Sequence, residues 1–280
     1  AVSVRTNNRN FESRTGTKSA KVFLASPESA VAASLRGVIT DPRDLGQDYP
    51  AVAMPAEFWI ADSLVLAPPD DPDAVAIFRG PNIGDPPKAE PLPDTLKGVV
   101  AIKVGDKITT DHIMPAGSRL KYRSNIPKYA EFVFEGVDPQ FAQKALENKR
   151  AGGHNIIVAG ASYGQGSSRE HAAICPMYLG VRAVVARSFE RIHAANLINF
   201  GILPLTFANE ADYDKLAAQE RIEIKGISDA LRRGGALSLT TAGGVVVPLN
   251  HSFSERQRGI LLAGGMLNYT RLKSAKPARS

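Results

Sequence analysis

A proline-rich segment limits how the whole chain can fold. Residues 66–94 hold eight of the 19 prolines. Proline lacks a backbone N–H and fixes φ, so such a segment is extended and semi-rigid. We therefore expect an interdomain linker at residues 66–94, with a smaller region over residues 1–65 before it and a larger domain over residues 95–280 after it.

The region before the linker has the pattern of the end of an α/β unit. Residues 20–24 predict a strand, and Ser26 with Pro27 predicts the start of a helix that Gly37 ends. The first residue is Ala1 and not Met, and patterned sequence follows at once. We expect the chain to be a piece of a longer polypeptide.

Strand and helix signals alternate beyond the linker, which indicates a mixed α/β domain. The expected strands are residues 98–103, 155–159, 181–186, 221–224, 236–240 and 245–249. The expected helices are residues 168–178, 189–199 and 254–263.

The composition is that of an ordinary globular protein, with 44% hydrophobic and 22% charged residues. No run of about 18 apolar residues is present, so the sequence predicts no transmembrane helix. Cys175 is the only cysteine, so the chain by itself holds neither an internal disulfide nor an iron–sulfur cluster. We expect a cytoplasmic protein.

The strongest chemical signal is a glycine-rich turn, Gly164-Gln165-Gly166-Ser167-Ser168-Arg169, between an expected strand and an expected helix. Such a turn leaves backbone N–H groups free to face an anion. Ser167 could act as a base where a helix N-terminus and Arg169 stabilise its alkoxide, and Arg169 could bind a carboxylate with two hydrogen bonds. A helix cap with a surface salt bridge explains the same residues equally well.

An overlapping pattern, Gly160-Ala161-Ser162-Tyr163-Gly164, matches the nucleophile elbow of serine hydrolases, and Asp229 and His251 follow in the order of that triad. The elbow requires a helix directly after the nucleophile. A second glycine turn intervenes here, so we do not favour a hydrolase. The sequence has no Gly-Lys-Ser/Thr, so it does not support a nucleotide P-loop either.

Two further clusters are candidates. In Thr110-Asp111-His112, the carboxylate could orient a base and the imidazole could transfer protons, although a turn with a satisfied histidine is the commoner outcome. Arg123 follows, and alone it is an ordinary surface arginine. The other cluster, Asn8-Arg9-Asn10-Phe11 with Arg14, is either an anion cradle or a solvated turn.

Together these clusters resemble motifs of the aconitase family of dehydratases, most closely in its bacterial members. The resemblance covers nearly the whole chain and rests on five ordered motifs. These are Asn8-Arg9-Asn10-Phe11-x-x-Arg14, Thr110-Asp111-His112-Ile113-x-Pro115-Ala116-Gly117, Tyr163-Gly164-x-Gly166-Ser167-Ser168-Arg169-Glu170-His171-Ala172-Ala173, Ser188-Phe189-x-Arg191-Ile192-His193 and Leu249-Asn250-His251-Ser252-Phe253.

The resemblance implies the tail of a three-layer α/β/α cluster-side domain, the linker, and a β/β/α swivel domain that closes over the substrate. In the family a [4Fe–4S] cluster held by three cysteines carries an iron that acts as a Lewis acid. Those cysteines are absent here, and Cys175 is wrongly placed to replace them. We expect the cluster ligands upstream of Ala1, so this chain alone should be inactive, as a fragment or as one subunit of a split enzyme.

The resemblance also implies roles for individual residues. Ser167 would remove the substrate proton, Ser168 would bind substrate, Asp111 would support proton transfer and Asn8 would lie at the cofactor. Arg169 would stabilise the Ser167 alkoxide. The arginines that would bind substrate carboxylates are Arg9, Arg14, Arg123 and Arg169.

The implied reaction is the interconversion of citrate and isocitrate through cis-aconitate, a step of the tricarboxylic acid cycle. Related dehydratases of isopropylmalate, homoaconitate or methylisocitrate are the alternative. Arg123 distinguishes them, because a guanidinium suits a third carboxylate whereas an isopropyl group would favour an apolar loop. RNA binding is a third reading that the net charge of +6 permits, but long basic runs are absent.

Overall fold

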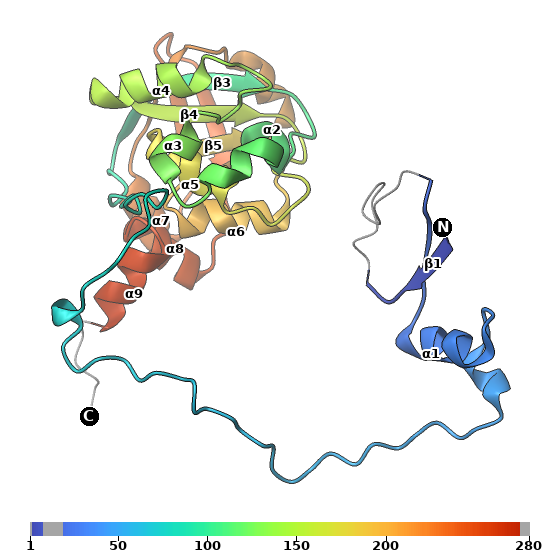
Figure 1. Cartoon of the computed structure of the whole chain (residues 1–280). Helices are drawn as coiled ribbons and strands as arrows, with labels where there is room; N and C mark the ends of the chain where they lie inside the picture. Colours follow the sequence, from blue (N-terminus) through green and yellow to red (C-terminus); the bar gives the residue numbers. More distant parts are fainter. Residues whose placement is uncertain (1, 8–18, 275–280) are drawn as a thin grey trace. The chain divides into compact units, whose positions relative to one another are not determined.

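The computed structural model describes residues 2–7 and 19–274, and the chain divides into two compact units, Ala1–Val75 and Ala76–Ser280. Each unit has its own secondary structure (Figure 1). Between the first helix and the sheet of the second unit, the chain is extended, with only two short 3-10 turns among its described residues, η1 (Pro42–Leu45) and η2 (Pro72–Ala74).

The first unit pairs β1 (Val2–Arg5) with β2 (Lys21–Leu24) in parallel, and α1 (Pro27–Arg36) follows. The Ser26 hydroxyl accepts a hydrogen bond from the Ser29 N–H at 3.2 Å and caps the helix. Gly37 ends it with φ of 72°, a conformation that favours glycine. The predicted strand and helix are confirmed, whereas β1 was not predicted.

The second unit is built on a closed barrel with the strand order β3-β4-β5-β6-β9-β8-β7. Neighbouring strands from β3 to β6 are parallel, and the remaining pairs are antiparallel. The strands are β3 (Leu96–Val104), β4 (His154–Ala159), β5 (Val181–Ala186), β6 (Leu203–Phe207), β7 (Arg221–Ile224), β8 (Leu237–Thr241) and β9 (Val246–Asn250).

Two apolar cores lie on the two faces of the parallel strands. All seven strands contribute side chains to one core, which therefore fills the barrel. Along β4, Ile156 and Val158 enter this inner core, while Ile157 and Ala159 enter an outer core with α3, α4 and α5. This alternation explains the continuous apolar runs of β4 and β5, because both faces of a parallel strand are covered.

Helices cover the barrel in two groups (Figure 1). α5 contacts α2 and α3, and α4 contacts β3 and β4, while α6 and α7 both contact α8 and α8 contacts α9. The helices are α2 (Thr110–Ile113), α3 (Ile126–Ala130), α4 (Phe141–Arg150), α5 (His171–Tyr178), α6 (Arg191–Asn199), α7 (Ile227–Arg233), α8 (Glu255–Leu262) and α9 (Met266–Ser274). Two 3-10 turns complete this unit, η3 (Gly117–Tyr122) and η4 (Glu210–Lys215).

The mixed α/β fold is confirmed, and six predicted strands of the barrel domain are present within two residues of their expected ends. The sequence analysis missed β6, α2, α3, α4, α7 and α9. One helix start was wrong, since α5 was expected from residue 168 and begins at His171. No helix in the described part of the chain is both long and apolar enough to cross a bilayer.

The end of the proline-rich segment packs on the barrel unit. The Arg182 guanidinium of β5 donates hydrogen bonds to the carbonyls of Glu90 and Pro91, both at 2.7 Å. The Asn268 amide of α9 donates to the Ala89 carbonyl at 2.9 Å. The chain is therefore held against the barrel from Ala89 onward, a few residues before β3 begins.

Asn155 joins three elements under the outer core. Its side chain is fully buried, and its amide nitrogen donates to the Ala145 and Leu179 carbonyls, each at 2.8 Å. Its amide oxygen accepts from Asn148 Nδ2 at 2.9 Å. One side chain thus links α4, β4 and the end of α5.

We expect Asn155→Ala to lower the free energy of unfolding by about 2–4 kcal/mol, because it leaves several buried polar groups without partners. Urea denaturation followed by far-UV circular dichroism measures the loss. Gln143→Ala, on the exposed face of α4, is the control and should cost less than about 0.5 kcal/mol. Equal losses in the two variants would show that Asn155 is not the link described.

Candidate functional site

Three loops meet where parallel strands end. They follow β3, β4 and β5, and the carboxyl ends of parallel strands lie at one edge of a sheet. The Gly164 N–H donates to the Ile108 carbonyl at 2.8 Å, and the Thr110 N–H donates to the Gln165 carbonyl at 2.9 Å. The Tyr163 N–H donates to the Ser188 carbonyl at 3.0 Å. Backbone bonds thus join the three loops directly.

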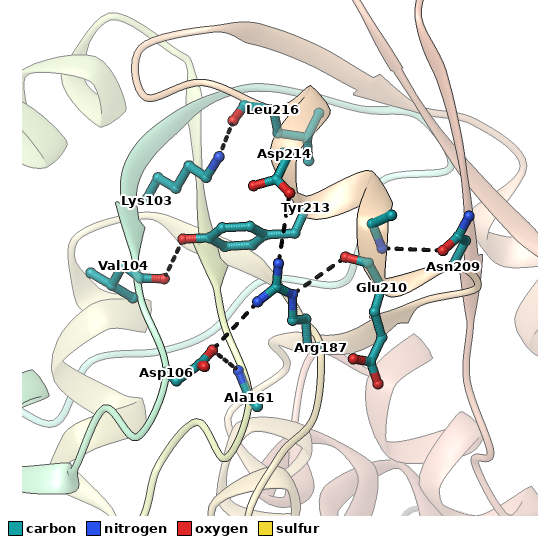
Figure 2. A network of polar contacts seen from close by, with 11 residues as sticks. Lys103, Val104, Asp106, Ala161, Arg187, Asn209, Glu210, Tyr213, Asp214 and Leu216 are labelled. Carbon is teal, nitrogen blue, oxygen red and sulfur yellow. Dashed lines mark hydrogen bonds and ion pairs between the residues drawn. The ribbon is translucent and has the colours of Figure 1, made fainter.

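A polar network anchors the bases of these loops (Figure 2). Asp106, just after β3, accepts a hydrogen bond from the Ala161 N–H at 2.7 Å and lies 3.7 Å from Nη1 of Arg187, which directly follows β5. The Arg187 guanidinium lies over the Tyr213 ring, and the Tyr213 hydroxyl donates to the Val104 carbonyl at 3.0 Å. These contacts hold the starting points of all three loops together.

The glycine turn is packed against a buried histidine. Gly164 has φ of 87°, and a Cβ at this position would overlap the His193 ring. His193 is 1% exposed, packs edge-on against Tyr163, and has no hydrogen-bond partner at either ring nitrogen within the described residues. Burial lowers the pKa of His193 to about 4, so the ring is neutral near neutral pH. The neutral ring fills the space beside Gly164, so no side chain larger than that of glycine fits at position 164.

Ser167 and Ser168 are exposed directly after this turn. Neither hydroxyl has a hydrogen-bond partner in the described ranges, so both are free to meet a ligand. The Arg169 N–H donates to the Ser167 carbonyl at 2.8 Å, a tight turn that delays α5 until His171. The helix dipole stabilises negative charge mainly at the first turn. Because α5 begins at His171, its dipole stabilises a Ser167 alkoxide less than the dipole of a helix that began at residue 168 would.

Arg169 joins the serine turn to the segment after β3. Its Nη1 donates to Asp111 Oδ1 at 2.6 Å and to the Met114 carbonyl at 2.8 Å. The Arg169 side chain is 15% exposed, whereas that of Asp111 is 61% exposed. Its Nε and Nη2 donors have no partner among the residues described, so they remain available to a carboxylate.

Arg123 is connected to the same region through His171. Nε2 of His171 lies 3.0 Å from the Arg123 carbonyl, and the Arg123 side chain is exposed at the end of η3. Its guanidinium forms no ion pair within the described part of the chain. The predicted residues Ser167, Ser168 and Arg169 therefore share one region with the exposed segment that carries Arg123.

Thr109 and His112 form a capping box at the start of the short helix α2, so His112 is satisfied as the commoner outcome predicted, but in a helix and not in a turn. Nδ1 of His112 accepts a hydrogen bond from the Thr109 N–H at 3.1 Å, and the His112 N–H donates to the Thr109 hydroxyl at 3.1 Å. The neutral ring therefore carries its proton on Nε2. The hydroxyl of Thr110, beside it, is buried without a partner among the described residues.

Three predicted residues, Asn8, Arg9 and Arg14, lie outside the described residues. The alternative triad does not assemble among the contacts of the described chain. The Ser162 hydroxyl donates to Glu190, Asp229 pairs with Arg233 at 2.8 Å, and Nε2 of His251 is bonded to the Gly235 carbonyl at 2.8 Å.

The sequence analysis gave no role to His171, Asp106, Arg187 or His193. Asp106 and Arg187 each follow closely after a strand that ends at the site edge, and that position was the available signal. The sequence contained no signal for His193 or His171, because their contacts join segments that are distant in the sequence.

The described residues do not fit an iron–sulfur cluster. They contain no group of three or more His, Cys, Asp and Glu side chains that could hold a metal ion. Cys175 is buried within α5, and burial raises the pKa of its thiol, which disfavours the thiolate that binds iron. A cluster would need ligands from elsewhere.

Residues 106–210 match the family model of the aconitase C-terminal domain. A putative mitochondrial aconitate hydratase of Aspergillus fumigatus is 33% identical over 93% of this chain and 38% of that protein. The mitochondrial homocitrate dehydratase of Saccharomyces cerevisiae is 30% identical over 94% of this chain and 39% of that protein. The chain therefore spans about two fifths of the length of these relatives.

A solved structure is also similar. The crystal structure of 3-isopropylmalate dehydratase from Methanocaldococcus jannaschii is 30% identical, with a TM-score of 0.53. The similarity covers 64% of this chain and 95% of that one. The expectation of a cytoplasmic protein is wrong, because several similar aconitate hydratases are named as mitochondrial.

We expect Gly164→Ala to destabilise the protein more than Gly244→Ala. Gly244 has a similar φ of 83° but open space around it, so its substitution should cost about 1–2 kcal/mol from backbone strain alone. Overlap with His193 should add about 1–3 kcal/mol at position 164. Denaturation midpoints test the difference, and the double variant Gly164→Ala, His193→Ala should recover part of the added loss. Equal losses in the two single variants would show that the His193 ring does not restrict position 164.

Proposed function

The chain belongs to the aconitase family, and we propose that it is the C-terminal part of an aconitate hydratase. This enzyme would interconvert citrate and isocitrate through cis-aconitate, a step of the tricarboxylic acid cycle. The observation that supports this most is the pair of exposed hydroxyls of Ser167 and Ser168 beside Arg169, which have no hydrogen-bond partner among residues 2–7 and 19–274. A carboxylic acid that loses a proton from carbon needs a base and a carboxylate-binding cation at that place.

We assign Ser167 as the base. Its alkoxide takes a proton from the carbon next to a substrate carboxylate, the electron pair of that C–H bond forms the double bond of cis-aconitate, and the hydroxyl group on the neighbouring carbon leaves as hydroxide. In the hydration direction the Ser167 hydroxyl returns the proton as hydroxide adds to the double bond. Arg169 stabilises the alkoxide, and its Nε and Nη2, which have no partner in the described part of the chain, bind a carboxylate together with the Ser168 hydroxyl. Asp111, paired with Arg169 at 2.6 Å, holds the guanidinium in place and supports proton transfer.

A tricarboxylate requires several cations. Arg123 would bind the carboxylate that distinguishes citrate from less charged substrates. Arg9 and Arg14 would complete the cradle, and Asn8 would lie at the cofactor. Fixed guanidinium groups suit this task because each presents two parallel donors to a carboxylate.

The proposed function also implies how the chain is divided into domains and which partner domains it requires. Residues 1–65 would be the tail of an α/β/α cluster-side domain, residues 66–94 the linker, and residues 95–280 a β/β/α swivel domain. N-terminal cluster-bearing domains, in the same chain or in a separate subunit, would carry the [4Fe–4S] cluster. That cluster supplies Lewis-acid chemistry when bound.

A related hydro-lyase is the second candidate, acting on 3-isopropylmalate, homoaconitate or 2-methylisocitrate. The similarity to a homocitrate dehydratase and to a 3-isopropylmalate dehydratase favours keeping it. The exposed guanidinium of Arg123 favours the tricarboxylate. RNA binding has less support, since the net charge of +6 is its main basis.

In the enzyme assembled with its cluster-bearing domains, Ser167→Ala should lower kcat for citrate by about 10²–10⁴, because a general base is lost. Ser168→Ala is the matched control and should raise KM more than it lowers kcat. Steady-state rates with citrate and isocitrate measure both. A Ser167→Ala enzyme with kcat within tenfold of the wild type would contradict the assignment of the base.

Arg123→Leu should lower kcat/KM for citrate by about 10–100-fold, the equivalent of one charge-assisted hydrogen bond to a carboxylate. The rate with 3-isopropylmalate should not fall. Lys121→Leu removes the same charge from the same exposed turn and should leave the preference unchanged. If Arg123→Leu does not disfavour citrate relative to 3-isopropylmalate, Arg123 does not bind the third carboxylate.

A further inference from the structure

His171 has no role in the mechanism proposed above, yet it touches the segment that carries Arg123. We propose that His171 is a positioning residue that determines where the Arg123 guanidinium lies relative to Ser167 and Ser168. It would thereby control the preference for substrates with a third carboxylate. The proposal rests on the proposed function, in which Arg123 binds substrate.

The segment between residues 114 and 123 is held at both ends by two side chains near the start of α5. Arg169 Nη1 donates to the Met114 carbonyl at 2.8 Å, and His171 Nε2 lies 3.0 Å from the Arg123 carbonyl. A carbonyl oxygen only accepts hydrogen bonds, so Nε2 carries the proton and donates it. Two residues that closely follow the candidate base thus secure the two ends of the Arg123 segment.

The imidazole ring is itself held in place. The ring of Tyr129, which is fully buried, lies edge-on to the His171 ring with 5.3 Å between centroids. The Tyr129 hydroxyl donates to the Pro115 carbonyl at 2.9 Å, at the other end of the same segment. Because Tyr129 fixes the orientation of the His171 ring, the hydrogen bond from Nε2 to the Arg123 carbonyl has a fixed direction. A ring without such a neighbour could rotate away from the carbonyl.

Other contacts hold the surrounding chain without His171. The Gly84 N–H donates to the Ser124 carbonyl at 2.9 Å, and the Asn125 side chain accepts from the Lys128 N–H at 3.1 Å and caps α3. Arg119 forms two hydrogen bonds with Glu135, at 2.7 and 3.2 Å. Loss of the His171 bond should therefore release the Arg123 carbonyl and loosen the last turn of η3, where the Arg123 N–H donates to the Leu120 carbonyl, while the rest of η3 and α3 stay folded.

The consequence is selective. A displaced Arg123 weakens only the contact to a carboxylate at that position, because Ser167 and Arg169 keep their own contacts. The KM for citrate should rise, with little change in kcat. A substrate with an apolar group there, such as 3-isopropylmalate, should be unaffected.

Two variants separate the hydrogen bond from the bulk of the side chain. His171→Leu fills similar space but donates no hydrogen bond, and His171→Gln keeps an N–H donor. Hydrogen–deuterium exchange on the 280-residue chain reads the backbone directly. The Arg123 and Asn125 amides should exchange about tenfold faster in His171→Leu, near wild-type rates in His171→Gln, and the Gly164 amide should not change.

The second arm measures kinetics in the enzyme assembled with its cluster-bearing domains. His171→Leu should raise KM for citrate about tenfold with kcat within twofold, and His171→Gln should restore KM. Unchanged exchange in His171→Leu overturns the proposal, and so does faster exchange without a change in KM. If the wild-type enzyme turns over neither citrate nor 3-isopropylmalate, the proposed function fails. The exchange rates alone then decide whether His171 positions Arg123.

Discussion

The contacts of one guanidinium hold the candidate site together. Arg169 belongs to the turn after β4, and it bonds to Asp111 and to the Met114 carbonyl in the segment after β3. The carboxylate and carbonyl occupy one nitrogen, and the others remain open among the described residues. The same side chain therefore joins two loops and leaves donors that could bind a ligand.

The barrel makes this arrangement possible. Parallel β3, β4 and β5 bring their following loops to one edge, and Asp106 and Arg187 connect the loop bases there. The outer core, which contains residues of α3, α4 and α5, also contains Tyr163, next to the glycine turn. His193 packs against Gly164 in that turn. A rigid frame of this kind suits a reaction in which a base and several carboxylate contacts act on one substrate.

The sequence predicted local features well and long-range contacts poorly. The cap at Ser26, the end at Gly37 and the strand at Val181–Ala186 follow from a few adjacent residues, and all three are confirmed. β6 was missed although β9, which has the same length and also contains a proline, was predicted, and α4 was missed because most of its residues are polar. The later start of α5 depends on the tight turn between Ser167 and Arg169, which no propensity encodes. The links from His171 to Arg123 and from His193 to Gly164 join distant segments, so only the fold reveals them.

The most direct test of the central claim is the hydration of cis-aconitate by the enzyme assembled with its cluster-bearing domains, comparing the wild type with Arg169→Lys. Lysine keeps the positive charge but loses the planar set of donors that both joins the loops and binds a carboxylate. We expect the wild type to form citrate and isocitrate, and Arg169→Lys to be slower by about a hundredfold or more. A wild-type enzyme without this activity, or an Arg169→Lys enzyme as fast as the wild type, would contradict the role of this site.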